Sequence, residues 1–267
     1  MTELSALRDC WQESGSEEDL SAYLLAWAEV QAPVPHVLET AARFGSEPAA
    51  KALGVEVAEP PAILQLHTTD ELRAAFGCWE VGFVYLLAVC RFVRGFWIQQ
   101  SPEAAEAMAE TGPLLKSSQD WFDKRRDEDA ATALVWGRAS WAQAELLEGR
   151  LEETTGRPDG ARGVRHLILS LGALAYVCAE PEAPFHRDRP QVSTSGVTTD
   201  EIRLQRVLSS HFEVREAVKG VMYAESPELN TKVGAFRKDI EPALARFEAR
   251  AASTLARWLL AGALTRR

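Results

Sequence analysis

The sequence has few of the residues that build metal centres and disulfide frameworks. It contains four cysteines and five histidines in 267 residues, and no two cysteines form a Cys-x-x-Cys pair. A structural zinc site needs cysteine or histidine ligands at close spacing, so we expect no metal and no other cofactor. Cys78, Cys90 and Cys178 stand among apolar residues, and we predict that they are core residues.

Motifs that bind phosphate or carry common catalytic chemistry are also missing. There is no Gly-rich phosphate loop, no Gly-x-Ser-x-Gly, no His-Glu-x-x-His and no Glu-x-x-His, so P-loop, hydrolase, zincin and di-iron chemistries lack their residues. His186-Arg187-Asp188 matches the start of a kinase catalytic loop. The asparagine that must follow the aspartate after five residues is replaced by Ser193, which excludes a kinase.

Long apolar runs are absent too. The two most apolar runs, Val81 to Cys90 and His166 to Ala179, are shorter than the roughly 20 residues that a membrane span needs. The N-terminal residues, MTELSALRDCWQESGSEED, are acidic and have no apolar centre, so we expect no secretory signal. These features predict a soluble cytoplasmic protein that does not contact a membrane.

Negative charge is abundant and unevenly distributed. Residues 1–60 carry eleven Asp or Glu and three Lys or Arg, whereas residues 201–267 carry eight acids and twelve bases. The short basic run Lys124-Arg-Arg126 is followed at once by Asp127-Glu-Asp129, which cancels its charge. An acidic head repels phosphate backbones and suits a basic partner. The sequence therefore predicts a basic protein partner and no nucleic acid.

Helix signals run along the whole chain, while no segment alternates with the period of a strand. The sequence predicts an all-α fold, a compact multi-helix bundle of about ten or eleven helices. Thr68-Thr-Asp-Glu71 is a capping box that predicts one long helix through Trp97, and Thr198-Thr-Asp-Glu201 predicts a helix over 200–223. Further helices are expected over 227–239 and 242–264, the last beginning at Pro242.

The eight tryptophans fall into two groups. Five lie in apolar helical stripes and are expected in the core, and three lie among charged residues and are expected at the surface as interface anchors. The core group is Trp27, Trp79, Trp97, Trp141 and Trp258, and the surface group is Trp11, Trp121 and Trp136.

A long loop interrupts the helical pattern after residue 180. We expect a single helical domain over 1–267, with possible sub-lobes 1–180 and 198–267 joined by the loop 181–197. Pro181, Pro184 and Pro190 stiffen the first half of this loop. One interpretation is a mobile linker.

A second interpretation makes the loop a partner-binding segment. Phe185, His186, Arg187 and Arg189 are then the candidate contact residues, because arginine beside an aromatic residue is typical of binding hot spots. A third interpretation is that Arg187 pairs within the chain with the acidic N-terminal third.

One catalytic pattern is present, and it lies in a predicted helix. Arg206-Val-Leu-Ser-Ser-His211 fits Arg-x4-His, the loose motif of the all-helical HEPN ribonucleases. Five positions at about 100° each place the two side chains about 140° apart on a helix. His211 falls on the apolar stripe of Leu204, Leu208, Val218 and Met222, so we predict a core histidine.

These observations favour a non-enzymatic protein-binding protein. One concrete form is an acidic inhibitor or immunity-type protein that neutralises a basic partner. The alternative is a helical enzyme with a dispersed active site, either a HEPN-like ribonuclease using Arg206 and His211 or a small-molecule enzyme. A deep pocket with convergent polar groups would favour the enzyme, and a broad acidic face would favour the binder.

Overall fold

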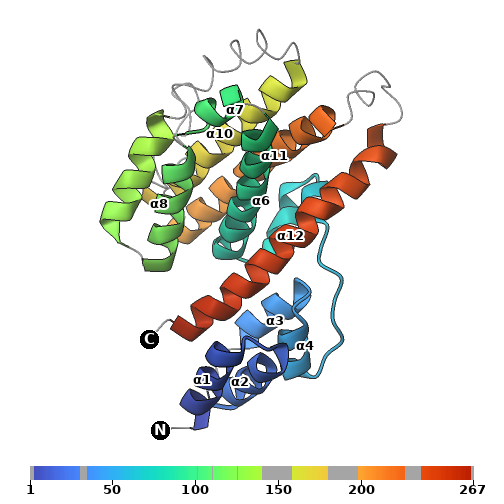
Figure 1. The fold of residues 1–267 in the computed structure, drawn as a ribbon, viewed down its shortest axis with the longest axis vertical. Coiled ribbons are helices and arrows are strands. Elements are labelled where there is room, and N and C mark those ends of the chain that lie inside the picture. Colours follow the sequence, from blue (N-terminus) through green and yellow to red (C-terminus); the bar gives the residue numbers. More distant parts are fainter. Residues whose placement is uncertain are drawn as a thin grey trace. The chain divides into compact units, whose positions relative to one another are not determined.

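The predicted all-α fold is confirmed. The computed structural model describes residues 3–30, 35–100, 102–109, 111–124, 126–139, 158–179, 198–225 and 236–265 (Figure 1). Within these ranges no residue is in a β-strand, and the regular elements are α-helices with one short 3-10 helix, η1. The loop 181–197 lies outside the described residues.

The chain divides into two units. Unit 1 comprises residues 1–62 and 249–267, and unit 2 comprises residues 63–248. Helix α12 (Phe236–Thr265) contributes its first part to unit 2 and the rest to unit 1. The helices that flank the loop 181–197 both belong to unit 2 and pack on each other. The arrangement of sub-lobes around that loop stays a prediction.

Unit 1 begins with four helices. They are α1 (Glu3–Ser14), α2 (Glu17–Val30), α3 (Pro35–Arg43) and α4 (Glu47–Leu53). α2 packs against α1 and α4, and α4 also packs against α3. The start of α2 is fixed by a helix cap, because the Ser16 hydroxyl accepts a 3.1 Å hydrogen bond from the Asp19 backbone amide.

Unit 2 contains the longer helices. They are η1 (Ile63–Gln65), α5 (Thr69–Phe76), α6 (Trp79–Gln100), α7 (Pro102–Ala107), α8 (Thr111–Lys124), an unlabelled helix over 127–139, α10 (Pro158–Ala179) and α11 (Thr199–Glu225). α11 packs on α6 and α10, and α10 also packs on α8. Every residue over 81–90 and over 171–178 is buried, so α6 and α10 form the centre of this core.

Glycines allow two helix pairs in unit 2 to approach closely. A Cβ atom placed on Gly163 of α10 would lie 2.6 Å from the Cα of Gly220 in α11. A Cβ on Gly82 of α6 would lie 2.6 Å from a methyl group of Val207 in α11. A side chain at either glycine would therefore push α11 away from its neighbour.

The expected long helix from Thr68 through Trp97 is wrong. The chain forms α5 and α6 instead, with a break at Gly77 and Cys78. Gly77 has φ +73° and its backbone amide donates a 2.9 Å hydrogen bond to the Arg73 carbonyl. A single glycine in the left-handed region thus ends the first helix.

The expected boundary at Pro242 is also wrong. α12 begins at Phe236 and continues through Pro242 to Thr265. Proline removes one backbone donor and disfavours the middle of a helix. Here the helix continues for six turns beyond the proline, with Leu244, Ala251 and Leu255 buried along it.

α6 is long and apolar enough to cross a membrane, judged by length and composition alone. Among the described residues, the segment Trp79–Gln99 of this helix alone meets both criteria. Within its most apolar 18-residue stretch, 67 % is buried inside the protein. A buried core helix satisfies the same two criteria.

The tryptophan and cysteine predictions hold in part. Trp27, Trp79 and Trp97 are buried as predicted, but Trp121 is 5 % exposed and is a core residue, not a surface anchor. Trp11 and Trp136 are partly buried, and the side chains of Trp141 and Trp258 lie outside the described residues. Cys90 and Cys178 are buried, while Cys78 is exposed, so the prediction for Cys78 is wrong.

Candidate functional site

The residues proposed to contact a partner are not among those that the structure describes. Phe185, His186, Arg187 and Arg189 all fall in the loop 181–197. The other sequence candidates, Arg206 and His211, both lie in α11 and can be examined directly.

His211 is a core histidine, as predicted. It is completely buried, and its Nε2 lies 2.9 Å from the carbonyl oxygen of Ile63, to which the ring donates its proton. Its Nδ1 is buried and has no hydrogen-bond partner among the described residues. Burial is the largest of the causes that together lower the pKa of His211 to about 4; nearby Arg215 and His67 act in the same direction, and the hydrogen bond to Ile63 opposes them. The ring is therefore neutral at pH 7.

Arg206 makes a different set of contacts. Its guanidinium lies 5.9 Å from the ring centroid of Tyr176 in α10, and burial lowers its pKa. His211 instead contacts the backbone of η1. The two side chains of the Arg-x4-His pattern are thus engaged with different segments, as their separation around the helix predicts.

A buried carboxylate of α12 is hydrogen-bonded to the same 3-10 turn. Glu248 of α12 is 5 % exposed, and its Oε1 accepts a 2.7 Å hydrogen bond from the backbone N–H of Leu64. Its Oε2 accepts a 3.3 Å bond from Nε2 of Gln65. Burial raises the pKa of Glu248, and these two bonds oppose that rise. We call His211, Glu248 and the turn Ile63–Gln65 the η1 clasp.

Polar and ionisable groups surround the η1 clasp. Tyr85 of α6 is buried, and its pKa is raised by burial and then by the charge of Glu248. Outside the clasp, Arg215 donates to Nδ1 of His67 at 2.9 Å. Glu71 accepts hydrogen bonds from the backbone amides of His67 and Thr68, which completes the predicted capping box of α5.

Sequence reasoning missed Glu248. It lies in the basic C-terminal segment, between two arginines, so the sequence suggests an ordinary surface carboxylate. The available signal was its spacing: Leu244, Glu248, Ala252 and Leu255 fall on one face of a helix, and the three neighbours are buried. An acidic residue on an apolar stripe indicates a buried, hydrogen-bonded carboxylate.

The two Thr-Thr-Asp-Glu segments meet in space. Arg73, in the last turn of α5, donates to both carboxylate oxygens of Glu201 in α11 at 2.9 and 2.6 Å. Thr198 accepts from the Glu201 backbone amide at 3.2 Å, so it caps α11 as predicted. Because both partners of the ion pair are partly exposed, the pair contributes about 1 kcal/mol or less.

An arginine packs on an aromatic cluster beside this ion pair. The guanidinium of Arg203 lies 5.0 Å from the ring centroid of Trp79 and 5.5 Å from that of Trp121. Asp200 accepts hydrogen bonds from Trp79 Nε1 at 3.1 Å and from Arg203 at 3.4 Å. These contacts explain why Trp121 is in the core, and they stabilise the junction of α6, α8 and α11.

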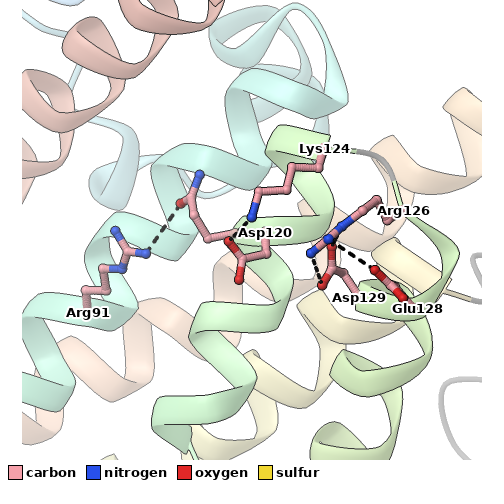
Figure 2. A network of polar contacts seen from close by, with 7 residues as sticks. Arg91, Asp120, Lys124, Arg126, Glu128 and Asp129 are labelled. Carbon is pink, nitrogen blue, oxygen red and sulfur yellow. Dashed lines mark hydrogen bonds and ion pairs between the residues drawn. The ribbon is translucent and has the colours of Figure 1, made fainter.

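The two described residues of the basic run 124–126, Lys124 at the end of α8 and Arg126 just after it, are paired with acids. Figure 2 shows Lys124 paired with Asp120 at 3.2 Å, and Arg126 paired with Glu128 and Asp129 at 3.1 and 2.6 Å. Arg91 donates to the amide of Gln119 at 3.5 Å. These groups alternate in sign, which is typical of a solvated surface and unlike a phosphate-binding patch.

The comparisons with known proteins provide no family. The chain matches no protein-family model, and neither the curated proteins nor the solved structures gave a significant match. Within the described ranges, no group of three or more His, Cys, Asp or Glu residues could hold a metal ion.

We predict that His211→Ala lowers the free energy of unfolding by about 1–3 kcal/mol. The change leaves a cavity and removes the bond to the Ile63 carbonyl, which keeps its 3.2 Å bond from the Leu66 amide. Urea unfolding followed by circular dichroism measures the loss. Ser209→Ala, at an exposed position two residues away, is the control and should change stability by less than about 0.5 kcal/mol. Equal stability of the two variants would contradict the buried role of His211.

Proposed function

We propose that the chain is a non-enzymatic protein-binding protein, an acidic inhibitor or immunity-type protein that neutralises a basic partner. The observation that carries this proposal is the exposed negative charge of residues 1–60, the first of the two segments of unit 1. Eight carboxylates within residues 1–60, here named the N-terminal acids, are exposed at the surface. They are Glu3, Glu13, Glu17, Glu18, Glu39, Glu47, Glu56 and Glu59.

Few positive charges oppose the N-terminal acids. Residues 1–60 contain Arg8, Arg43 and Lys51. Arg8 pairs with Asp9 at 3.2 Å, and the guanidinium of Arg43 lies 5.5 Å from the ring centroid of Phe44. Residues 249–267, which belong to the same unit, add four arginines and no acid, so unit 1 keeps a net charge of −4. A net negative charge attracts a basic protein and repels nucleic acid and anionic lipid.

The buried position of His211 also supports a binder over a HEPN-like ribonuclease. A general base must reach the proton that it removes and must have a pKa near the working pH. His211 is fully buried, donates to a backbone carbonyl and has a pKa of about 4. Phe185, His186, Arg187 and Arg189 remain proposed partner contacts, and the cytoplasm remains the proposed compartment.

The proposal is tested by reversing charges at two N-terminal acids. Glu13→Lys with Glu56→Lys should slow association with a basic partner at least about tenfold at low salt, because steering depends on the local field. Both residues are exposed, and Glu13 lies in the last turn of α1, where lysine suits the helix dipole. The partner is first isolated by affinity purification from the native cell, and association is then measured by stopped-flow fluorescence at low and high salt.

The control is a double reversal in unit 2. Glu106→Lys with Asp127→Lys, also at exposed positions, makes the same change in net charge, from −10 to −6. It should leave association within about twofold of the wild type if the field is local. Equal slowing by both variants, or isolation of nucleic acid in place of a basic protein, would contradict the proposal.

A further inference from the structure

The η1 clasp joins the two points where the chain passes between the units. The chain enters unit 2 at Ile63 and leaves it at Glu248. These points are far apart in sequence, yet the Leu64 amide and the Glu248 carboxylate, 184 residues apart, form a 2.7 Å hydrogen bond. Because all the bonding groups belong to unit 2, the clasp is a feature of that unit alone.

α11 holds the same turn through a single titratable ring. The Ile63 carbonyl accepts from His211 Nε2 at 2.9 Å and from the Leu66 backbone amide at 3.2 Å. His211 therefore fixes the 3-10 turn to α11, and Glu248 fixes it to α12. Without the histidine bond, the turn is held, among the described residues, only by the Glu248 carboxylate and by its internal bond from the Leu66 amide, and opening of the turn breaks both.

The surroundings of His211 do not accommodate a second ring proton. Nδ1 is buried, and no described group accepts a hydrogen bond from it. The charged or titratable groups whose fields reach the ring are Arg215 of α11 and His67, which lies between η1 and α5. Glu248 of α12 and Tyr85 of α6 interact with each other, and Glu71 of α5 is bonded to the His67 backbone. No described carboxylate is hydrogen-bonded to His211, so an imidazolium there would be desolvated and uncompensated.

We propose that the η1 clasp is an acid-released latch, in which protonation of His211 detaches the turn Ile63–Gln65 from α11 while the helical core of unit 2 stays folded. The released turn exposes His211 to water, which solvates the new charge. The two chain crossings at Ile63 and Glu248 are then no longer held to α11. The device does not depend on the proposed binding function.

The direction of the effect follows from proton linkage. The pKa of His211 is about 4 with the turn closed and 6.5 when the ring is solvated. The closed latch is therefore most stable above pH 6.5 and weakens as the pH falls toward 4. From these two values, the opening constant at pH 5 should be roughly 30-fold larger than at pH 8. Glu248 acts in the opposite direction, because its raised pKa favours the closed, protonated form in acid.

Amide hydrogen exchange resolved by NMR tests the latch in the intact chain. The amides of Leu64 and Leu66 are measured between pH 8 and pH 5 and corrected for the intrinsic exchange rate. The amides of Val84 to Val89 in α6, all buried, report opening of the core. We expect the opening constant of the turn amides to rise severalfold and by up to roughly 30-fold from pH 8 to pH 5, because Glu248 offsets part of the His211 effect, and that of the α6 amides to change less than about threefold. A pH-independent turn, or a turn and core that open together, would overturn the proposal.

Two variants assign the effect to the histidine. His211→Gln keeps a donor for the Ile63 carbonyl but does not titrate, so its turn should open no more at pH 5 than at pH 8. Glu248→Gln should raise opening at every pH and keep the acid response. If the glutamine at 211 prevents folding, the wild type and Glu248→Gln still decide the question. An acid response that persists unchanged in His211→Gln, or disappears in Glu248→Gln, would show that His211 is not the trigger.

Discussion

Phe83→Ala is expected to lower the free energy of unfolding by about 3–5 kcal/mol, the largest effect of any single change considered. Phe83 of α6 is completely buried and stacks on Phe122 with ring centroids 5.2 Å apart. Its edge-to-face neighbours are Trp79 and Trp121, at 6.3 and 6.2 Å. Truncation removes the burial of the ring, leaves a cavity and breaks these three aromatic contacts. Guanidinium unfolding followed by tryptophan fluorescence and circular dichroism measures the loss.

The matched control is the same substitution at an exposed phenylalanine. Phe212 is 36 % exposed and makes an edge contact with His211. Phe212→Ala should cost about 1–2 kcal/mol, clearly less than Phe83→Ala, because the Phe212 ring is already partly in water. Comparable losses at positions 83 and 212 would mean that the aromatic cluster is not the centre of the unit 2 core.

Gly163→Ala is expected to destabilise the protein by about 1–3 kcal/mol, although alanine is the better helix former. The added Cβ would lie 2.6 Å from the Gly220 Cα and 3.4 Å from Cζ2 of Trp97. The first of these atoms belongs to the backbone of α11, so relief requires a shift of the whole helix. Thermal unfolding followed by circular dichroism should show a lower midpoint for this variant.

Gly95→Ala provides a control with the opposite sign. Gly95 lies inside α6, and no atom outside its own helix backbone lies within 4 Å of the Cβ that alanine would add. The substitution should raise stability by up to about 1 kcal/mol through helix propensity. Stabilisation by alanine at both glycines would contradict the close crossing of α10 and α11.

The fold class was predictable because it depends on local signals. The capping threonines Thr68 and Thr198 mark helix starts that the structure contains. The apolar stripe of α11 placed His211 inside and turned Arg206 away from it, which matches the contacts that each makes. Periodicity and caps are properties of short segments, so they remain visible in a single sequence.

Features that arise from pairs of distant residues were not predictable. The ring of Trp121 is buried because Arg203 and Trp79 pack on it from other helices, and its acidic neighbours in sequence suggested a surface position. The hydrogen bond between Leu64 and Glu248 joins residues 184 positions apart, and no sequence pattern around either residue points to the other. The burial of a side chain and its long-range hydrogen bonds depend on how the helices pack, and a short segment of sequence does not determine that packing.

His211, the histidine most open to a catalytic interpretation, is enclosed in the core of unit 2. The most direct test is an NMR titration of the histidine rings in the intact chain, with His211→Gln used to assign the resonance. We predict that the His211 ring stays neutral at pH 7 and titrates with a pKa of about 4. A His211 pKa near the ordinary value of 6.5 in the folded protein, with a resonance that shifts when RNA is added, would contradict the account and favour the ribonuclease alternative.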